Sequence, residues 1–158
     1  MRFCACFAAA TLLSSAAGAQ QIPTRPYAEY RTDAIIARGT AAQLGGGVVL
    51  PAGLYVRLGI DGAAGATWRY GQTFGSGRVD VIARFLLDPF RESRIGFSLG
   101  GGVSAPIGSA EPAQPPYLTA VFDIEGRRSG GMTPALQIGL GGGTRIGIVL
   151  RHSPLQWR

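Results

Sequence analysis

The chain has no lysine, few charges and only two cysteines, and each shortage excludes a class of protein. Charged residues make up 15% of its 158 residues, whereas a soluble surface usually carries about 25–35%. All 15 basic residues are arginines, and they are scattered along the chain rather than clustered. The net charge of +6 therefore does not indicate a nucleic-acid-binding patch, and we expect no nucleic-acid partner.

Both cysteines, Cys4 and Cys6, lie in a segment typical of export. A basic start precedes an apolar run from Phe3 to Leu13, and small residues end the segment at Ala19. This pattern predicts a secretory signal peptide, in preference to a cytosolic N-terminal helix. Its removal leaves no thiol, no disulfide and no cysteine metal ligand. Export without disulfides favours a bacterial envelope protein over a small secreted scaffold.

A membrane-spanning helix is also excluded. One stretch of 18 residues between Arg38 and Arg57 has no charge, which is long enough to cross a bilayer. It contains three consecutive glycines at 45–47, and also Pro51 and Gly53. These residues oppose a helix, so the stretch is assigned to strands.

What the chain does have is a strict alternation over residues 54–70. Apolar side chains such as Leu58 and Ile60 occupy the even positions, while Arg57 and Asp61 stand at odd positions. A period of two predicts a strand with one apolar and one polar face. Whole charges of both signs on the polar face are typical of a transmembrane β-barrel, with lipid outside and a packed polar interior.

Similar alternation divides the rest of the chain into further strands. Turns at 51–53, 88–93 and 128–131 are assigned to the periplasmic side, and the outer loops are placed near Gly39 and at 71–77, 108–116 and 141–143. Residues 133–151 keep one parity, so they form either one long strand or two. We prefer two, because one strand would span roughly 60 Å at about 3.3 Å per residue. Eight strands result, and an even number keeps both termini in the periplasm.

The expected fold is all-β: an antiparallel up-and-down meander closed into a transmembrane β-barrel of eight strands. The expected parts are a signal peptide (1–19), a short leader (20–26), the barrel (27–152) and a C-terminal tail (153–158).

This architecture resembles the small eight-stranded outer-membrane barrels, the class with OmpA-like and OmpX-like domains, over essentially the whole mature chain. Those barrels end in an assembly signal of the form polar-x-Gly-x-x-hydrophobic-x-aromatic. Residues 145–152 follow that form up to His152, which stands in the aromatic position. The resemblance implies recognition by the barrel-assembly machinery and a location in the lipid of a Gram-negative outer membrane.

The polar faces predict a network of charges inside the barrel. Eight strands enclose only enough space for their own side chains, and each charge there needs a partner. We therefore expect a plugged interior rather than a pore, with interior glycines leaving room for arginines. The principal charges are Arg57, Asp61, Asp80, Arg84, Asp123, Glu125 and Arg145. Glu29, Arg31, Asp33, Arg78, Arg127 and Arg151 lie on corresponding faces, and Asp80 and Arg84 are the expected neighbours of Arg57 and Asp61.

Aromatic residues near the strand ends predict two interfacial girdles. Trp68, Tyr70 and Tyr117 fall near outer ends, and Phe90 falls near an inner end.

No catalytic, cofactor or metal site is expected, and we predict that the protein is not an enzyme. Asp123 and Glu125 share one strand face, where pairing with arginine is expected rather than acid–base chemistry. His152 is the only histidine, which disfavours a transition-metal site.

Two functions remain open. The first is an outer-membrane barrel with a structural or surface-interaction role, carried by its outer loops. The alternative is a soluble exported lipocalin-like barrel that binds a small apolar ligand. The alternative requires Leu58, Ile60, Phe97 and Phe122 to face inward. Low charge and the many Gly, Ser and Thr residues opposite the apolar positions favour the first.

Overall fold

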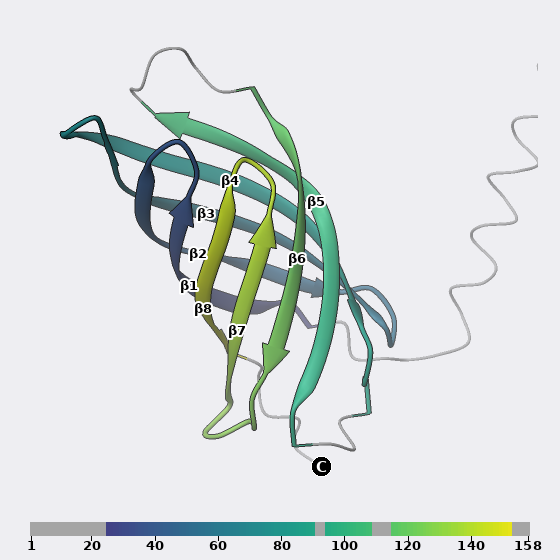
Figure 1. Ribbon diagram of the computed structural model, residues 1–158. Helices are drawn as coiled ribbons and strands as arrows, with labels where there is room; N and C mark the ends of the chain where they lie inside the picture. Colours follow the sequence, from purple (N-terminus) through teal and green to yellow (C-terminus); the bar gives the residue numbers. More distant parts are fainter. Residues whose placement is uncertain (1–24, 91–93, 109–114, 153–158) are drawn as a thin grey trace, which may run out of the picture.

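The computed structural model describes residues 25–90, 94–108 and 115–152, which form a closed barrel of eight antiparallel strands (Figure 1). Each strand pairs with its neighbours in sequence, and β1 pairs with β8 to close the barrel. The predicted all-β fold and its strand number are confirmed. The strands are β1 (Tyr27–Ile36), β2 (Thr40–Pro51), β3 (Val56–Arg69), β4 (Gln72–Leu86), β5 (Gly96–Gly108), β6 (Tyr117–Glu125), β7 (Met132–Leu140) and β8 (Thr144–His152).

The predicted signal peptide, residues 20–24 of the leader and the tail after His152 lie outside the described residues. Among the residues that are described, no helix is long and apolar enough to cross a membrane.

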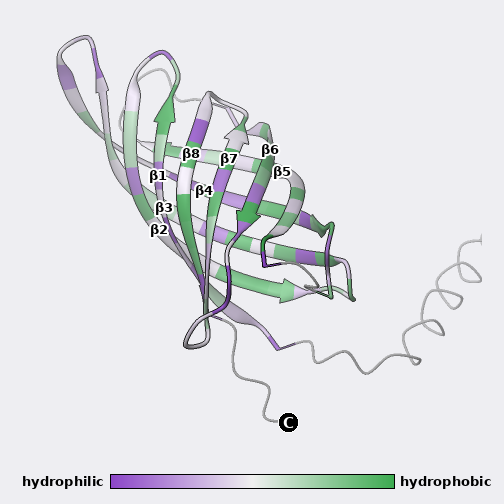
Figure 2. Ribbon diagram, turned by 60° about the horizontal axis from the view of Figure 1, so that its bottom comes forward, coloured by the Kyte–Doolittle hydropathy of each residue, from purple (hydrophilic) through white to green (hydrophobic). Residues whose placement is uncertain are grey.

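The alternation orients every strand with its apolar side chains outward. Leu58 and Ile60 on β3 are 46% and 57% exposed, whereas Asp61, which follows Ile60, is 2% exposed. Large exposed hydrophobic side chains occur on all eight strands, and Figure 2 shows the alternation of hydropathy along them. This orientation is the reverse of the one that the lipocalin-like alternative requires.

The interior holds an apolar part as well as charges. Val49, Ile82, Val121 and Val149 are almost completely buried, and each shares its strand face with buried polar residues. These side chains fill the space between the charged groups, as expected for a barrel of this size.

The assignment of residues 71–77 to an outer loop is wrong. Tyr70 and Gly71, with φ of 52° and 74°, form a two-residue turn, and positive φ at both positions is typical of the type I′ hairpin. Residues 72–77 then pair with residues 64–69 of β3. Glycine and serine have low strand propensity, but pairing with an adjacent long strand overrides it.

The segment 133–151 contains two strands, as preferred. β7 and β8 meet at Gly141, Gly142 and Gly143, whose φ values of 129°, 66° and 142° lie where glycine is favoured. The outward residues of both strands have even numbers because three residues connect the strands, and not because the strand is continuous.

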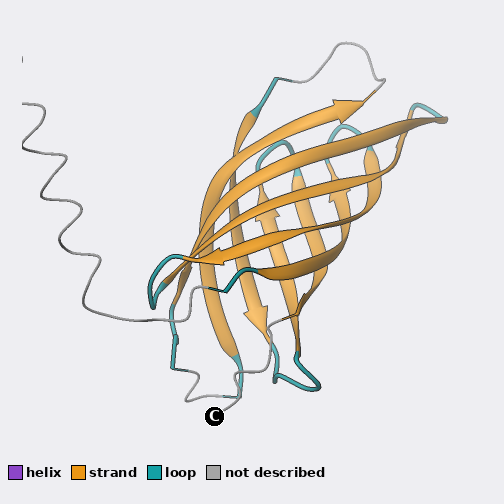
Figure 3. Ribbon diagram, turned by 180° about the vertical axis from the view of Figure 1, so that it is seen from behind, coloured by secondary structure: helices purple, strands orange, loops and turns teal. Residues whose placement is uncertain are grey.

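The barrel is taller on one side. β3, β4 and β5 have 14, 15 and 13 residues, whereas β6, β7 and β8 have nine each. We call the end where β1 begins and β8 ends the terminal end, and the opposite end the hairpin end. The β3–β4 hairpin consequently projects past the β7–β8 hairpin at the hairpin end (Figure 3).

Candidate functional site

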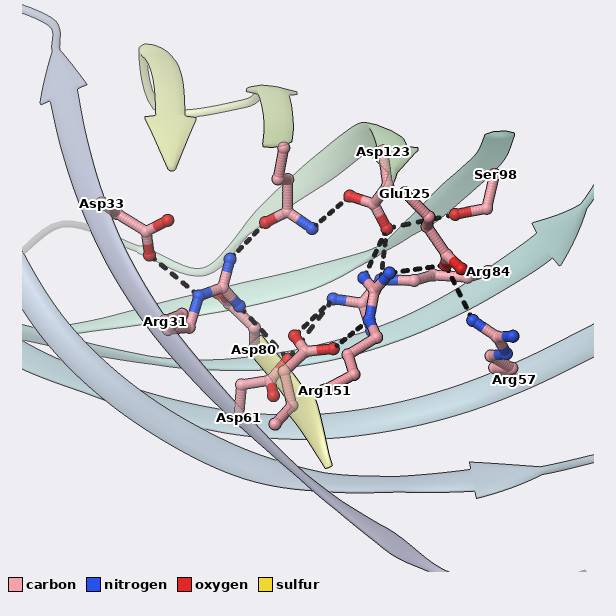
Figure 4. Close-up of polar contacts among 12 residues, drawn as sticks. Arg31, Asp33, Arg57, Asp61, Asp80, Arg84, Ser98, Asp123, Glu125 and Arg151 are labelled. Atoms are coloured by element: carbon pink, nitrogen blue, oxygen red, sulfur yellow. Dashed lines mark hydrogen bonds and ion pairs between the residues drawn. The ribbon is translucent and has the colours of Figure 1, made fainter. Parts of the chain in front are cut away.

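Twelve charged side chains come together inside the barrel, and we call them the interior network. All are buried except Arg57, whose side chain is 16% exposed. Ion pairs join them through the lumen, and most are drawn in Figure 4. The members are the acids Glu29, Asp33, Asp61, Asp80, Asp123 and Glu125 and the arginines Arg31, Arg57, Arg78, Arg84, Arg145 and Arg151.

Arg151 is the centre of the part nearest the terminal end. Its guanidinium contacts three carboxylates: Nε lies 2.8 Å from Glu29, and Nη1 and Nη2 lie 2.6 Å from Glu125 and Asp123. Arg84 approaches two of these acids, at 3.0 Å from Glu29 and 3.3 Å from Asp123. One arginine therefore neutralises acids from two different strands, β1 and β6.

Asp80 is the centre of the part nearest the hairpin end. Arg78 Nε lies 2.9 Å from its carboxylate, Arg145 Nη1 lies 2.8 Å from it, and the Ser104 hydroxyl donates to it at 2.6 Å. Arg78 also pairs with Asp33. Asp80 thus keeps more than one cationic partner, whereas Arg145 forms a single ion pair with the described residues.

Arg31, Asp61 and Gln137 connect the two parts. Arg31 pairs with Asp33 at 2.9 Å and donates to Asp61 at 3.2 Å. It also donates to the side-chain oxygen Oε1 of Gln137, and Nε2 of the same side chain donates to Asp123 at 2.7 Å. The network is therefore continuous along the barrel axis.

Asp80 and Arg84 are the neighbours of Asp61 and Arg57 on the adjacent strand, as expected from sequence, but they are not the closest ion-pair partners. Arg57 lies directly opposite Arg84 on the adjacent strand, and Asp61 lies opposite Asp80, so the nearest cross-strand positions carry like charges. Arg57 instead pairs at 2.8 Å with Glu125, across the lumen on β6. Asp61 does approach Arg84, at 3.7 Å, along a diagonal of the sheet.

All seven principal charges predicted from sequence lie in this network, but Arg127 does not. Arg127 follows the end of β6 and is exposed at the terminal end. Its alternation with Glu125 holds only if the strand continues, and the strand stops at Glu125 itself.

Several neutral members were missed. Gln43, Gln137, Ser98 and Ser104 are buried and hydrogen-bond to charged or polar interior groups. Each alternates with outward-facing residues of its strand and so lies on the interior face. That alternation could have predicted its position from the sequence.

The four predicted interface aromatics lie in four different places. Trp68 is outward on β3 and 48% exposed, and Tyr70 is 85% exposed in the β3–β4 turn. Phe90 is 66% exposed in the connection between β4 and β5. Tyr117 differs from the prediction: it shares the inward face of Thr119 and its ring lies beside Gly142 at the hairpin end.

Interior glycines leave space for the charged side chains. A Cβ added at Gly59 would lie 2.8 Å from Arg84 Nη1, and one at Gly139 would lie 2.9 Å from Arg145 Nε. A Cβ at Gly147 would overlap Asp33 Oδ1 and approach the carbonyl oxygen of Thr32 to 2.9 Å.

Gly147→Ala is expected to destabilise the barrel by about 1–3 kcal/mol, the usual range for overpacking. The added methyl group displaces the Asp33 carboxylate from Arg31 and Arg78. Gly62→Ala is the matched control, because no atom lies within 4 Å of its added Cβ. Urea unfolding in lipid vesicles measures both, and equal stabilities for the two variants would contradict the close contact.

The histidine and the buried acids lie on different faces of the barrel wall. His152 is exposed on the outward face of β8, away from the buried acids. Within the described ranges, no cluster of three or more His, Cys, Asp or Glu residues has the arrangement of a metal site. The carboxylates of the network are engaged with arginines.

No protein-family model matches the chain, and no curated protein matches it in sequence. Its structure is similar to a de novo designed transmembrane β-barrel, with a TM-score of 0.59 and 12% identity, over 85% of this chain and 98% of that chain. It is also similar to Neisserial surface protein A, with a TM-score of 0.55 and 11% identity, over 82% and 96% of the two chains. The chain therefore has the fold of transmembrane β-barrels, and the resemblance to small eight-stranded membrane barrels is confirmed for the architecture.

Proposed function

We propose that this protein is an integral outer-membrane barrel of a Gram-negative bacterium with a structural or surface-interaction role. In this proposal the signal peptide exports the chain, and the barrel-assembly machinery inserts it into the membrane. One observation carries the proposal: the charges neutralise one another inside the barrel while apolar side chains cover its outer surface. Only a lipid surrounding makes that arrangement favourable over the reverse one.

Aromatic side chains near the strand ends support a membrane setting. At the terminal end, Tyr55 stacks on Phe85 with ring centroids 5.7 Å apart, and both are about half exposed. Trp68 lies toward the other end, also outward. Amphipathic rings at both ends of an apolar band are typical of interfacial girdles.

The interior network supports a closed rather than conducting barrel. Its ion pairs cross the lumen, as Arg57 on β3 does with Glu125 on β6 and Arg84 on β4 does with Glu29 on β1. An ion entering this space would have to separate buried charge pairs, which is strongly unfavourable. The protein's role is then assigned to the hairpin end, where β3, β4 and β5 extend past the other strands.

Planar-bilayer recording tests the closed interior. The purified protein is expected to produce no steady, ion-selective channels. Heat-modifiable gel mobility of the same sample provides the control that the barrel is folded. Steady unitary currents from heat-modifiable protein would overturn the closed interior.

Cell fractionation tests the location independently. The protein is expected in the membrane fraction, and its extraction is expected to require detergent. Recovery of the folded protein in the soluble periplasmic fraction would contradict the proposed membrane location.

A further inference from the structure

A cavity of about 290 Å³ opens at the hairpin end, above the interior network. Its walls come from the taller side of the barrel, β2 to β5, with Tyr117 and Gly142 on the opposite side. The volume is near the lower end of the range for small-molecule sites, about 300–1,000 Å³.

The floor of the cavity is a closed polar layer. Arg78 donates to the Gln43 side-chain oxygen at 2.6 Å, and the Gln43 amide nitrogen lies 3.2 Å from the Ser76 hydroxyl. The remaining nitrogens of Arg78 contact Asp33 and Asp80 below. Because Arg78 is fully engaged, the floor separates the cavity from the rest of the lumen.

The rim of the cavity carries positive charge. Arg38 and Arg69 line it, and among the described lining residues none is acidic. Gly39, the residue after Arg38, lies close to Arg69, because a Cβ added at Gly39 would lie 3.2 Å from Arg69 Cβ. Arg69 Nε is buried and has no hydrogen-bond partner in the described part of the chain.

The pKa of the Tyr70 hydroxyl is affected by the same positive charges. The Arg69 guanidinium lies 4.9 Å from the centre of its ring. A hydrogen bond with Arg69, and then the charges of Arg69 and Arg38, lower the pKa of the Tyr70 hydroxyl. Positive charge at this rim therefore favours an anion.

The walls between rim and floor are largely apolar. Phe74 stands at the inward parity of β4, and Pro106 stands at that of β5. Ile35 and Tyr117 complete the apolar lining from other strands. A ligand that fits the whole cavity combines an anionic group for the rim with an apolar group for the walls.

We propose that this cavity binds a small soluble anion that carries an apolar group, such as an aryl phosphate, sulfate or carboxylate. Arg69 and Arg38 hold the anion, and Phe74, Pro106 and Tyr117 contact the apolar group. Phe74, Ser76 and Arg78 belong to the inward face, so the ligand enters from the solvent at the hairpin end and not from the lipid. The inference goes beyond the proposed cellular role and depends only on the barrel itself.

Isothermal titration calorimetry in uncharged detergent micelles tests the site with phenyl phosphate as the probe. Saturable one-to-one binding is expected, with clearly weaker binding of inorganic phosphate and of benzyl alcohol. Arg69→Gln is expected to weaken phenyl phosphate binding by about tenfold to a hundredfold, the usual effect of a hydrogen bond to a charged group. Arg38→Gln provides a second variant, which weakens binding in the same direction.

Arg127→Gln is the matched control, because it removes an exposed arginine at the terminal end and leaves the cavity intact. Its affinity is expected to equal that of the unaltered protein. Equal losses for Arg127→Gln and Arg69→Gln would overturn the site, as would the absence of saturable binding. If inorganic phosphate binds as tightly as phenyl phosphate, the proposed contact with an apolar group of the ligand is wrong. If phosphatidylglycerol displaces the probe, the ligand is a lipid headgroup and not a small soluble anion.

Discussion

Replacing Arg151 by glutamine is expected to destabilise the barrel by about 3–5 kcal/mol, the usual loss when one partner of a buried ion pair is removed. Arg151 uses all three guanidinium nitrogens, and each contacts a different carboxylate. Glutamine is shorter and uncharged, so Glu29, Asp123 and Glu125 lose their common counter-charge in a buried place. Urea unfolding in lipid vesicles, followed by heat-modifiable gel mobility, measures the loss.

Arg145→Gln is the matched control for Arg151→Gln. Both arginines are buried on β8, but among the described residues Arg145 forms one ion pair, with Asp80, and Arg78 remains paired with that acid after the substitution. Its loss of stability is expected to be less than half that of Arg151→Gln. Equal losses would contradict the unequal roles assigned to the two residues.

A second substitution is expected to offset part of the stability loss caused by Arg151→Gln. Adding Glu29→Gln to Arg151→Gln removes one of the carboxylates left without Arg151. The double variant is therefore expected to be more stable than the sum of the two single losses predicts. Strict additivity would show that the two groups do not interact.

Ile60→Arg is expected to destabilise the protein in a bilayer by about 2–4 kcal/mol, the effect of arginine facing lipid at the midplane. Ile60 is 57% exposed and lies in a row of outward apolar residues, between Val48 on β2 and Val81 on β4. A charge at this position faces the hydrocarbon layer, where no partner neutralises it. Unfolding titrations in vesicles measure the change.

Ile36→Arg is the control for depth. Ile36 is 58% exposed, almost the same as Ile60, but it is the last residue of β1, at the hairpin end. Arginine near the interface is expected to destabilise by only about 0–1 kcal/mol. A soluble barrel would show small and equal effects at both positions, because water would solvate either charge, and that outcome would contradict a membrane setting.

Which residues share a face could be predicted from the sequence, because side chains on a strand alternate regardless of the strand's partners. The period of two puts Leu58 and Ile60 on one face of the strand and Arg57 and Asp61 on the other. That the first face points outward was decided by the structure. The strand ends were less predictable. The β3–β4 turn has a non-glycine residue, Tyr70, at positive φ, so its position was not evident from the sequence. The glycine-rich segment after it was therefore assigned to a loop, although it belongs to β4.

The ion-pair partners depended on the closed tertiary structure. Arg57 pairs with Glu125, 68 residues away, and Arg151 pairs with Glu29, 122 residues away. Local alternation contains no information about which strands face each other across the lumen, and the sheet register puts like charges side by side on β3 and β4. Closure decides that geometry, since it places β8 beside β1, where Arg151 lies opposite Glu29, and brings β6 across the lumen from β3.

The sequence by itself determined that this protein has strands with one apolar and one charged face, and it favoured a barrel with the charges inside over the reverse orientation. Only the tertiary structure decided which charges neutralise one another, and that Tyr117 borders a cavity rather than a lipid interface. The physical reason is that a side chain's face is a local property of the backbone. Its partner depends on strand register, barrel closure and unequal strand lengths, which involve the whole chain.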